Sequence, residues 1–211
     1  MSIDKKLAEC GAFLYDLEII CAVPMRGEPR KENLYYCKGW EDYEGMGISV
    51  VTAYDFAESS YRIYLEDNLS DLRTIINSRG VIIGFNNNRF DNNVLSANGI
   101  HIPKQKSYDL WEHIVNSVPD GQGARRGYSL QNMLDANGLQ AKSGLGAQAP
   151  IWAQNAQWGR LISYCLDDTK LELQLLRLAC ADLMKSPKTG EYMNIKKPWE
   201  LECVETGGIF S

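Results

Sequence analysis

Two carboxylates separated by one residue, Asp16 and Glu18, interrupt the apolar run of residues 11–20. In a β-strand this spacing places both side chains on one face and turns Leu17, between them, toward the core. Like charges on a mostly buried strand repel each other and are poorly solvated, and a divalent cation held by oxygen ligands relieves both problems. The pair therefore points to a metal site, with a solvent-facing edge strand as the alternative.

A second pair, Tyr164 and Asp168, lies one helical turn apart within residues 157–184. Both fall on the stripe that an amphipathic helix turns toward a core. The apolar members of this stripe are Leu161, Leu171, Leu175 and Leu178. An unpaired charge at Asp168 would destabilise the fold by several kcal/mol, so this residue needs either a metal ion or a Lys or Arg partner. Asp167 points about 100° away around the helix and is expected to face solvent.

A third candidate, Asp91, ends the stretch Gly84-Phe-Asn-Asn-Asn-Arg-Phe-Asp91, directly after the apolar residues 81–84. Loops at the ends of buried strands often build functional sites. Taken alone, Asp91 would equally suit a capping role at the start of a helix over residues 90–97. A single metal site shared by all four acids would explain their positions together.

The remaining pattern predicts the elements that position these residues. Strands are expected over residues 11–20, 47–55, 60–66 and 81–84, the second and third forming a hairpin. Helices are expected over residues 68–78, 90–97, 107–118, 129–137 and 157–184. Strands followed by alternating strands and helices predict an α/β fold, in which a mixed sheet carries helices on its faces.

The length of the chain predicts one domain over residues 1–211, with a core of about 11–184 and a C-terminal extension of 185–211. The connection over residues 22–46 is longer than a structureless loop usually is. We therefore expect this connection either to be functional or to contain short elements of its own.

The composition of the chain argues against several classes of protein. The chain is 45% hydrophobic and 23% charged, as ordinary globular proteins are, and it has no apolar run long enough to cross a membrane. Without a secretory apolar region at its N-terminus, it is expected to be soluble and cytoplasmic. Six cysteines without a C-x-x-C pair, with only two histidines, argue against zinc. A net charge of −5 argues against a non-specific nucleic-acid coating protein, although bound metal ions would let an acidic site hold a phosphodiester.

Three motifs together resemble a known family. Asp16-x-Glu18, Asn86-x-x-x-Phe90-Asp91 and Tyr164-x-x-x-Asp168 match, in order and spacing, the motifs of the DEDDy 3′-to-5′ exonucleases. Ser163 stands where the histidine subclass would carry His, which favours the tyrosine subclass. The chain thus resembles the exonuclease domains of family-B DNA polymerases and of some helicase-associated proteins. This resemblance implies a ribonuclease H-like fold, a mixed five-stranded sheet flanked by helices.

The resemblance also implies roles for individual residues. Asp16 would bridge two Mg²⁺ or Mn²⁺ ions, Glu18 and Asp168 would complete the site of one ion, and Asp91 would hold the other partly through water. Tyr164 would position the attacking water by its hydroxyl. The implied substrate contacts are Asn86 and Phe90, and the backbone of Leu17 is expected to approach the 3′ nucleotide. The basic loop residues Lys142, Arg125 and Arg126 are candidate phosphate contacts by their charge. Plain core packing of Phe90 and simple solvation of the basic residues are the alternatives.

The implied activity is metal-dependent hydrolysis at the 3′ end of single-stranded nucleic acid, with DNA favoured over RNA and 5′-mononucleotides as products. The implied partners are single-stranded DNA 3′ ends and an unidentified polymerase or helicase, without any membrane. Two alternatives stay open at this stage. One is an exoribonuclease with the same chemistry, and the other is a non-catalytic nucleic-acid-binding module on the same fold.

Overall fold

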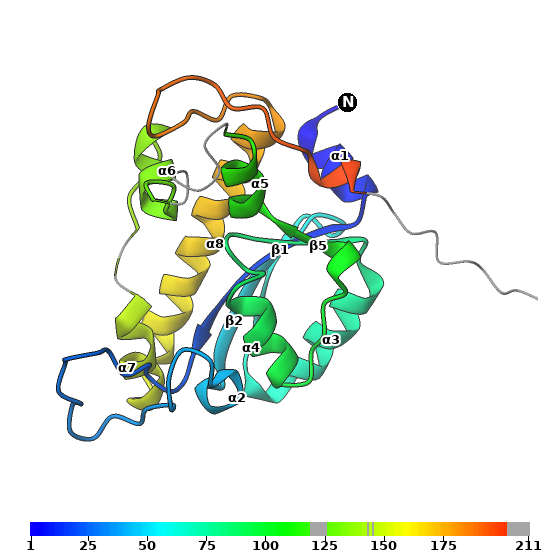
Figure 1. Ribbon diagram of the computed structural model, residues 1–211. Helices are drawn as coiled ribbons and strands as arrows, with labels where there is room; N and C mark the ends of the chain where they lie inside the picture. Colours follow the sequence, from blue (N-terminus) through cyan, green and yellow to red (C-terminus); the bar gives the residue numbers. More distant parts are fainter. Residues whose placement is uncertain (119–125, 143, 145, 202–211) are drawn as a thin grey trace, which may run out of the picture.

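The residues that the structure describes contain a mixed sheet of five strands (Figure 1). The computed structural model describes residues 1–118, 126–142, 144 and 146–201. The strands are β1 (Ala12–Ile19), β2 (Ile48–Asp55), β3 (Ser60–Tyr64), β4 (Val81–Gly84) and β5 (Ser107–Asp109), in the spatial order β3-β2-β1-β4-β5. β2 is antiparallel to β1 and β3, and β4 is parallel to β1 and β5. This confirms the predicted α/β class and is consistent with a ribonuclease H-like fold.

β1 is the central strand, because it pairs with β2 on one side and with β4 on the other. The edge-strand alternative for Asp16 and Glu18 is therefore wrong. Alternation along β1 divides its side chains between two cores: Phe13 packs in one apolar cluster and Leu14 in the other, on opposite faces of the sheet. Leu17 lies in the same cluster as Phe13, as predicted, and is 4% exposed.

Helices cover both faces of the sheet (Figure 1). On the Leu14 face lie α1 (Ile3–Glu9), α5 (Leu110–Asn116), α6 (Leu130–Ala136) and the long α8 (Trp158–Cys180). On the Phe13 face lie α2 (Tyr43–Met46), α3 (Leu69–Ser78) and α4 (Asp91–Ala97). α7 (Ala149–Gln154) packs beside the N-terminal part of α8. The 3₁₀ turns are η1 (Glu66–Asn68), η2 (Lys104–Lys106), η3 (Gly146–Gln148) and η4 (Pro198–Glu200).

The hairpin, the strand over residues 81–84 and the helices that follow are confirmed, with small shifts at their ends. The helix predicted over residues 107–118 is wrong in its first turn, because residues 107–109 form β5 beside β4. Asp109 then caps α5 by accepting a hydrogen bond from the backbone N–H of Glu112 at 3.2 Å. Three helices were not predicted, α1, α2 and α7, and α7 begins within the loop expected over residues 141–150.

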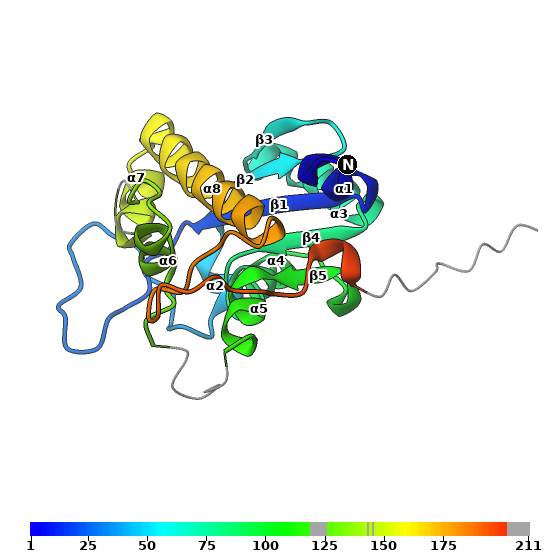
Figure 2. The same ribbon diagram turned by 90° about the horizontal axis from the view of Figure 1, so that it is seen from above.

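The 22–46 connection contains short elements, as expected. Ala22 and Tyr36 form an isolated β-bridge, and α2 closes the segment. Gln154 of α7 holds the connection in place, since its amide bonds to the backbone of Tyr35 through both polar atoms, at 2.7 and 3.0 Å. The same amide donates to the carbonyl of Ile20 at 2.8 Å. Figure 2 shows the connection (blue) projecting from the sheet beside α7.

The described part of the C-terminal extension packs on the body of the protein. Met193 and Ile195 are buried in the cluster that contains Leu14. The Tyr108 hydroxyl donates a hydrogen bond to the carbonyl of Lys196 at 2.5 Å. Residues 202–211 lie outside the described part of the chain. Among the described helices, none has both the length and the apolar character that a membrane crossing requires.

Candidate metal centre

Three of the predicted acids converge on one point. Carboxylate oxygens of Asp16, Glu18 and Asp168 all lie within 4.8 Å of one another. Asp16 and Glu18 share the face of β1 that α8 covers, because they are two residues apart on a strand. Asp168 comes from the middle of α8, about 150 residues further along the chain, and is 2% exposed. The fold therefore assembles an acid cluster, defined here as these three residues, from two distant segments.

Polar contacts between buried side chains fix α8 on the sheet at this point. The hydroxyls of Thr52 and Thr169 lie 2.6 Å apart, and Thr52 is the residue that pairs with Asp16 across the sheet. The thiol of Cys165 lies 3.6 Å from the Asp16 carboxylate. Each of these short side chains lets the helix approach the strands closely. Their contacts set the rotation of α8 that turns Asp168 toward β1.

Asp91 lies near the acid cluster without belonging to it. It is the first residue of α4, and Phe90 occupies the N-cap position before it. Asp91 therefore does not stand at the position of a capping residue. Asp91 is close enough to Asp16 that the two charges interact: burial raises the pKa of Asp91, and the Asp16 charge raises it further.

Lys142 forms an ion pair with Asp168, with the ammonium 2.7 Å from Oδ2. The alternative partner considered for Asp168, a basic side chain, is thus present. The ion pair engages only one carboxylate oxygen, since Oδ1 is buried and has no hydrogen-bond partner among the described residues. Asp167 is 41% exposed on its side chain and pairs with Lys170, as its place on the helical wheel predicts.

The Tyr164 side chain lies one turn before Asp168 on the same face of α8 and is 3% exposed. Its hydroxyl is buried and has no hydrogen-bond partner among the described residues. Its ring packs edge-on against Trp152 at 5.5 Å between centroids, and the Lys142 ammonium lies 5.9 Å from the ring centre. Burial raises the pKa of Tyr164, so the phenol stays protonated at neutral pH.

Glu172 is a fifth acid that the sequence reasoning missed. It follows Asp168 by one further turn of α8, is 3% exposed, and has a buried Oε2 without a hydrogen-bond partner among the described residues. Burial raises the pKa of Glu172, and the charges of Asp16 and Asp91 raise it further. Its spacing of four from Asp168 was the available signal, because that spacing continues the stripe facing the sheet.

The acid cluster carries more negative charge than the neighbouring positive charge balances. Burial and the neighbouring Asp168 raise the pKa of Asp16 to about 7, although Lys142 opposes the shift. Burial and the Asp16 charge raise the pKa of Glu18 well above its usual range. One ammonium thus balances only part of the negative charge. A divalent cation would favour the ionised form of every one of these carboxyls.

The donor set fits such a cation. Carboxylate oxygens are the ligands that Mg²⁺ and Mn²⁺ prefer, and three of them converge here without any thiolate or imidazole in the cluster. The unpartnered Oδ1 of Asp168 is a further sign, because an isolated buried carboxylate oxygen costs free energy unless something positive meets it.

Hydrogen bonds to Asp109 support the segment that carries Asn86, Phe90 and Asp91. Asp109 accepts hydrogen bonds from the backbone N–H groups of Asn86 and Asn88, at 2.9 and 3.1 Å. Asn86 has φ of 63°, a left-handed conformation that Asn tolerates better than most residues. These bonds hold the turn after β4 in the shape that starts α4 at Asp91.

The residues predicted to contact a substrate are placed differently from one another. Phe90 packs partly against the core and also lines a cavity. The Leu17 side chain is buried in the core, which leaves only its backbone for the contact. Lys142 points at Asp168. Arg125 lies outside the described residues, and Arg126 is exposed.

Comparisons with known proteins support the fold. The structure of the family B DNA polymerase from the hyperthermophilic archaeon Pyrobaculum calidifontis matches with a TM-score of 0.53 and 15% sequence identity. The match covers 85% of this chain and 26% of the polymerase chain, so the chain spans about a quarter of that protein's length. Neither the comparison with protein-family models nor the comparison with curated proteins gives a match. At this identity the likeness concerns the fold alone, an α/β arrangement with a five-stranded mixed sheet.

Proposed function

We propose that the protein is a metal-dependent 3′-to-5′ exonuclease that acts on single-stranded ends, DNA more than RNA, and releases 5′-mononucleotides. The observation that carries this proposal is the convergence of Asp16, Glu18 and Asp168 within 4.8 Å, from segments far apart in the chain. The buried Tyr164 hydroxyl one turn away and the fold shared with a DNA polymerase add support. A polymerase or helicase partner belongs to the proposal, since the protein of similar fold is a DNA polymerase.

In this proposal Asp16, Glu18 and Asp168 would hold one Mg²⁺ or Mn²⁺ ion, and Asp16 with Asp91 would hold a second. Such ions stabilise the attacking and leaving oxygens of a phosphoryl displacement and acidify bound water. The Tyr164 hydroxyl orients the water rather than removing its proton, because burial raises the pKa of this phenol. Lys142, whose pKa is raised by Asp168 despite its burial, stays charged and can exchange its carboxylate partner for a substrate phosphate.

The test is digestion of a 5′-labelled single-stranded DNA oligonucleotide and of the matched RNA, each with Mg²⁺, with Mn²⁺ and with EDTA. We expect a ladder of products shortened from the 3′ end, release of 5′-mononucleotides, and no reaction in EDTA. Asp16→Ala and Asp168→Asn should each lower the rate by about 1,000-fold, since each removes a ligand that supports several kcal/mol of charge stabilisation.

Asp167→Asn is the matched control, because Asp167 neighbours Asp168 in sequence but its side chain is 41% exposed and pairs with Lys170. It should retain full activity. Digestion that survives Asp16→Ala would contradict the proposal. A faster reaction on RNA would reassign the enzyme as an exoribonuclease, and binding of nucleic acid without hydrolysis under every metal condition would favour a non-catalytic module.

A further inference from the structure

Glu172 is a buried acid that lies outside the acid cluster. It is 3% exposed, and its buried Oε2 has no hydrogen-bond partner among the described residues. None of the ion pairs between described residues involves it, and the ammonium of Lys142 pairs with Asp168 instead. A buried carboxylate oxygen is disfavoured unless a donor or a positive charge meets it. Glu172 therefore indicates a ligand that the described side chains do not supply.

The direction of α8 shows where Glu172 lies along β1. Leu161, near the start of α8, packs in the cluster that contains Val50, and Val50 pairs with Glu18 near the end of β1. Arg177, near the end of α8, forms an ion pair with Asp4 of α1, which directly precedes β1. α8 therefore runs antiparallel to β1, and its C-terminal half lies over the N-terminal half of the strand.

Glu172 thus lies on the side of Asp16 away from Glu18, because it follows Asp168 by one turn of α8. The neighbouring charges agree with this position. Burial raises the pKa of Glu172, and among the neighbouring charges that of Asp16 raises it most and that of Asp91 next. Burial also raises the pKa of Glu18, but there Asp168 follows Asp16. Glu172 is therefore associated with Asp91, as Glu18 is with Asp168.

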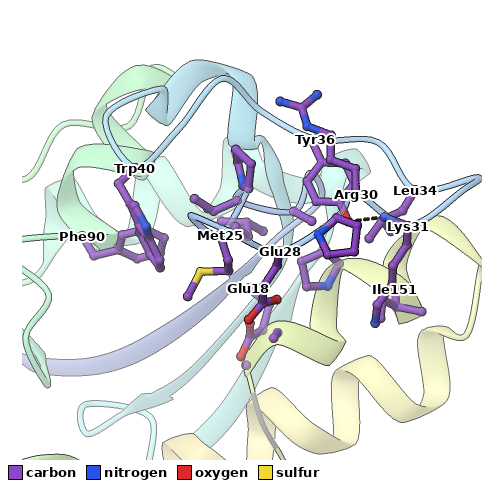
Figure 3. Close-up of a pocket in the computed structure, with 18 residues that line it drawn as sticks. Glu18, Met25, Glu28, Arg30, Lys31, Leu34, Tyr36, Trp40, Phe90 and Ile151 are labelled. Atoms are coloured by element: carbon purple, nitrogen blue, oxygen red, sulfur yellow. Dashed lines mark hydrogen bonds between the residues drawn. The ribbon is translucent and has the colours of Figure 1, made fainter.

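The two glutamates also have different surroundings. Glu18 borders a cavity of about 400 Å³, most of whose walls come from the 22–46 connection (Figure 3). Glu172 is not one of the residues that line this cavity. The two carboxyls therefore serve different parts of the site.

We propose that Glu172 is a positioning residue for the second metal ion, the one assigned to Asp16 and Asp91, and that it accepts hydrogen bonds from the water around that ion. This inference rests on the metal site of the proposed function. Among the described residues, the acid cluster is the group of three acids whose oxygens all lie within 4.8 Å of one another. Glu172 is spaced more widely from Asp16 and Asp91, so it reaches their ion through water.

A carboxylate in this place suits the ions concerned. Mg²⁺ loses its water reluctantly and is usually bound through one or two carboxylates while it keeps several water molecules. An acceptor behind those water molecules fixes their orientation and adds negative charge near the ion. The second ion would therefore depend on three acids, of which two bind it and Glu172 holds its water.

The first measurement is the number of bound Mn²⁺ ions and their affinities, from titration calorimetry with and without a deoxynucleoside 5′-monophosphate, the proposed product. The wild type should bind two ions. Glu172→Gln should bind one of them about tenfold more weakly, a typical loss when the partner of a ligand is removed, and the other unchanged. Asp91→Asn should weaken the same ion, so that adding Glu172→Gln to it costs little more. Asp167→Asn, on the exposed face of α8, is the control and should change neither affinity.

The second measurement is thermal melting at pH 8, which separates this role from packing. Gln keeps the shape of the Glu side chain without its negative charge. In EDTA the melting temperature of Glu172→Gln should equal or exceed that of the wild type, since a like charge near Asp16 is gone. Mn²⁺ should then raise it by less than it raises the wild type. A lower melting temperature in EDTA with an undiminished gain from Mn²⁺ would show a packing role and overturn the assignment.

The outcomes for Glu172 and for the exonuclease proposal are separate. Two Mn²⁺ ions bound by Glu172→Gln with wild-type affinities would overturn the assignment, while digestion of DNA by the wild type would leave the exonuclease proposal standing. Mn²⁺ binding that depends on Glu172, without any digestion of DNA or RNA, would keep the assignment and remove the exonuclease proposal. A wild type that binds fewer than two ions in both conditions would overturn the assignment.

Discussion

Tyr164 and Tyr64 both have a buried hydroxyl, but the surroundings of the two side chains differ. Each has a buried hydroxyl without a hydrogen-bond partner among the described residues. Tyr64 lies on β3 at the edge of the sheet, whereas Tyr164 lies on α8 beside Asp168. An unpartnered buried hydroxyl costs free energy. Beside the acid cluster, the Tyr164 hydroxyl suggests a role at that site, whereas the Tyr64 hydroxyl on β3 suggests only a packing role.

Tyr164→Phe should lower kcat about 10- to 100-fold and leave KM nearly unchanged, because it removes the group that orients the water but keeps the ring packed. Tyr64→Phe should leave kcat unchanged, as it deletes an equivalent hydroxyl far from the acids. The measurement is steady-state digestion of labelled single-stranded DNA by both variants. Equal kcat values for Tyr164→Phe and the wild type would assign Tyr164 a packing role only.

Glu172→Gln should weaken Mn²⁺ binding several-fold, since it removes a buried carboxyl beside Asp16 and Asp91 that a bound cation would keep ionised. Binding is followed by titration calorimetry on the protein without substrate. Asp167→Asn removes the same charge from the solvent-facing side of α8 and should change the affinity little. An affinity of Glu172→Gln equal to that of Asp167→Asn would show that Glu172 does not act on the metal.

At the scale of elements, three local devices bring the site together. The central β1 turns Asp16 and Glu18 toward α8, the Thr52–Thr169 contact orients α8, and Asp109 shapes the turn between β4 and α4. Asp109 accepts hydrogen bonds from three backbone N–H groups in two different segments. It therefore links the capping of α5 to the geometry of the turn that carries Asn86.

Asp109→Ala should lower the free energy of unfolding by about 2–3 kcal/mol, because it leaves buried backbone donors without their acceptor. It should also reduce kcat/KM, as the turn before Asp91 loses its support. Chemical denaturation and digestion kinetics check the two effects. Ser2→Ala is the control: Ser2 caps α1 away from the acid cluster, so we expect a loss of about 1 kcal/mol and no change in kcat/KM.

At the scale of the whole molecule, the acid cluster opposes folding at neutral pH when no cation is bound. The folded-state pKa of Asp16, about 7, lies above the usual value of an unfolded Asp, about 3.9. Such a group favours the folded state in its protonated form, and this contribution is lost as pH rises from about 4 to 7. Asp55 behaves in the opposite way: burial alone would raise its pKa, but hydrogen bonds from Arg79 and Arg62 lower it, so its contribution is lost in acid.

We therefore expect the melting temperature in EDTA to fall between pH 5 and pH 8, and Mg²⁺ or Mn²⁺ to restore it at pH 8 by binding the folded state only. Thermal melts at several pH values, with and without the metal, provide the measurement. Asp16→Asn should show a flatter pH dependence in EDTA and little gain from metal. A melting temperature that rises steadily from pH 5 to pH 8 in EDTA would contradict this account of the cluster.

The order of the longer elements and the alternation of β1 followed from the sequence, because both depend on local periodicity. Residues 107–109 were assigned to a helix because a three-residue strand leaves no periodic signal of its own, and only pairing with β4 makes it a strand. Glu172 was missed for a related reason. Its spacing of four from Asp168 placed it on the stripe that faces the sheet, but that spacing does not show that its carboxyl lies beside Asp16 and Asp91, which are on other segments.

Residue types and their spacing alone determined that Asp16, Glu18, Asp91, Tyr164 and Asp168 are candidates for one site, since spacing along a strand or helix decides which side chains share a face. Only the tertiary structure decided that three of these carboxylates meet, that Lys142 pairs with Asp168, and that the 22–46 connection walls a cavity beside Glu18. These are contacts between segments far apart in the chain. Their distances depend on how helices and loops pack against the sheet, which local periodicity does not encode.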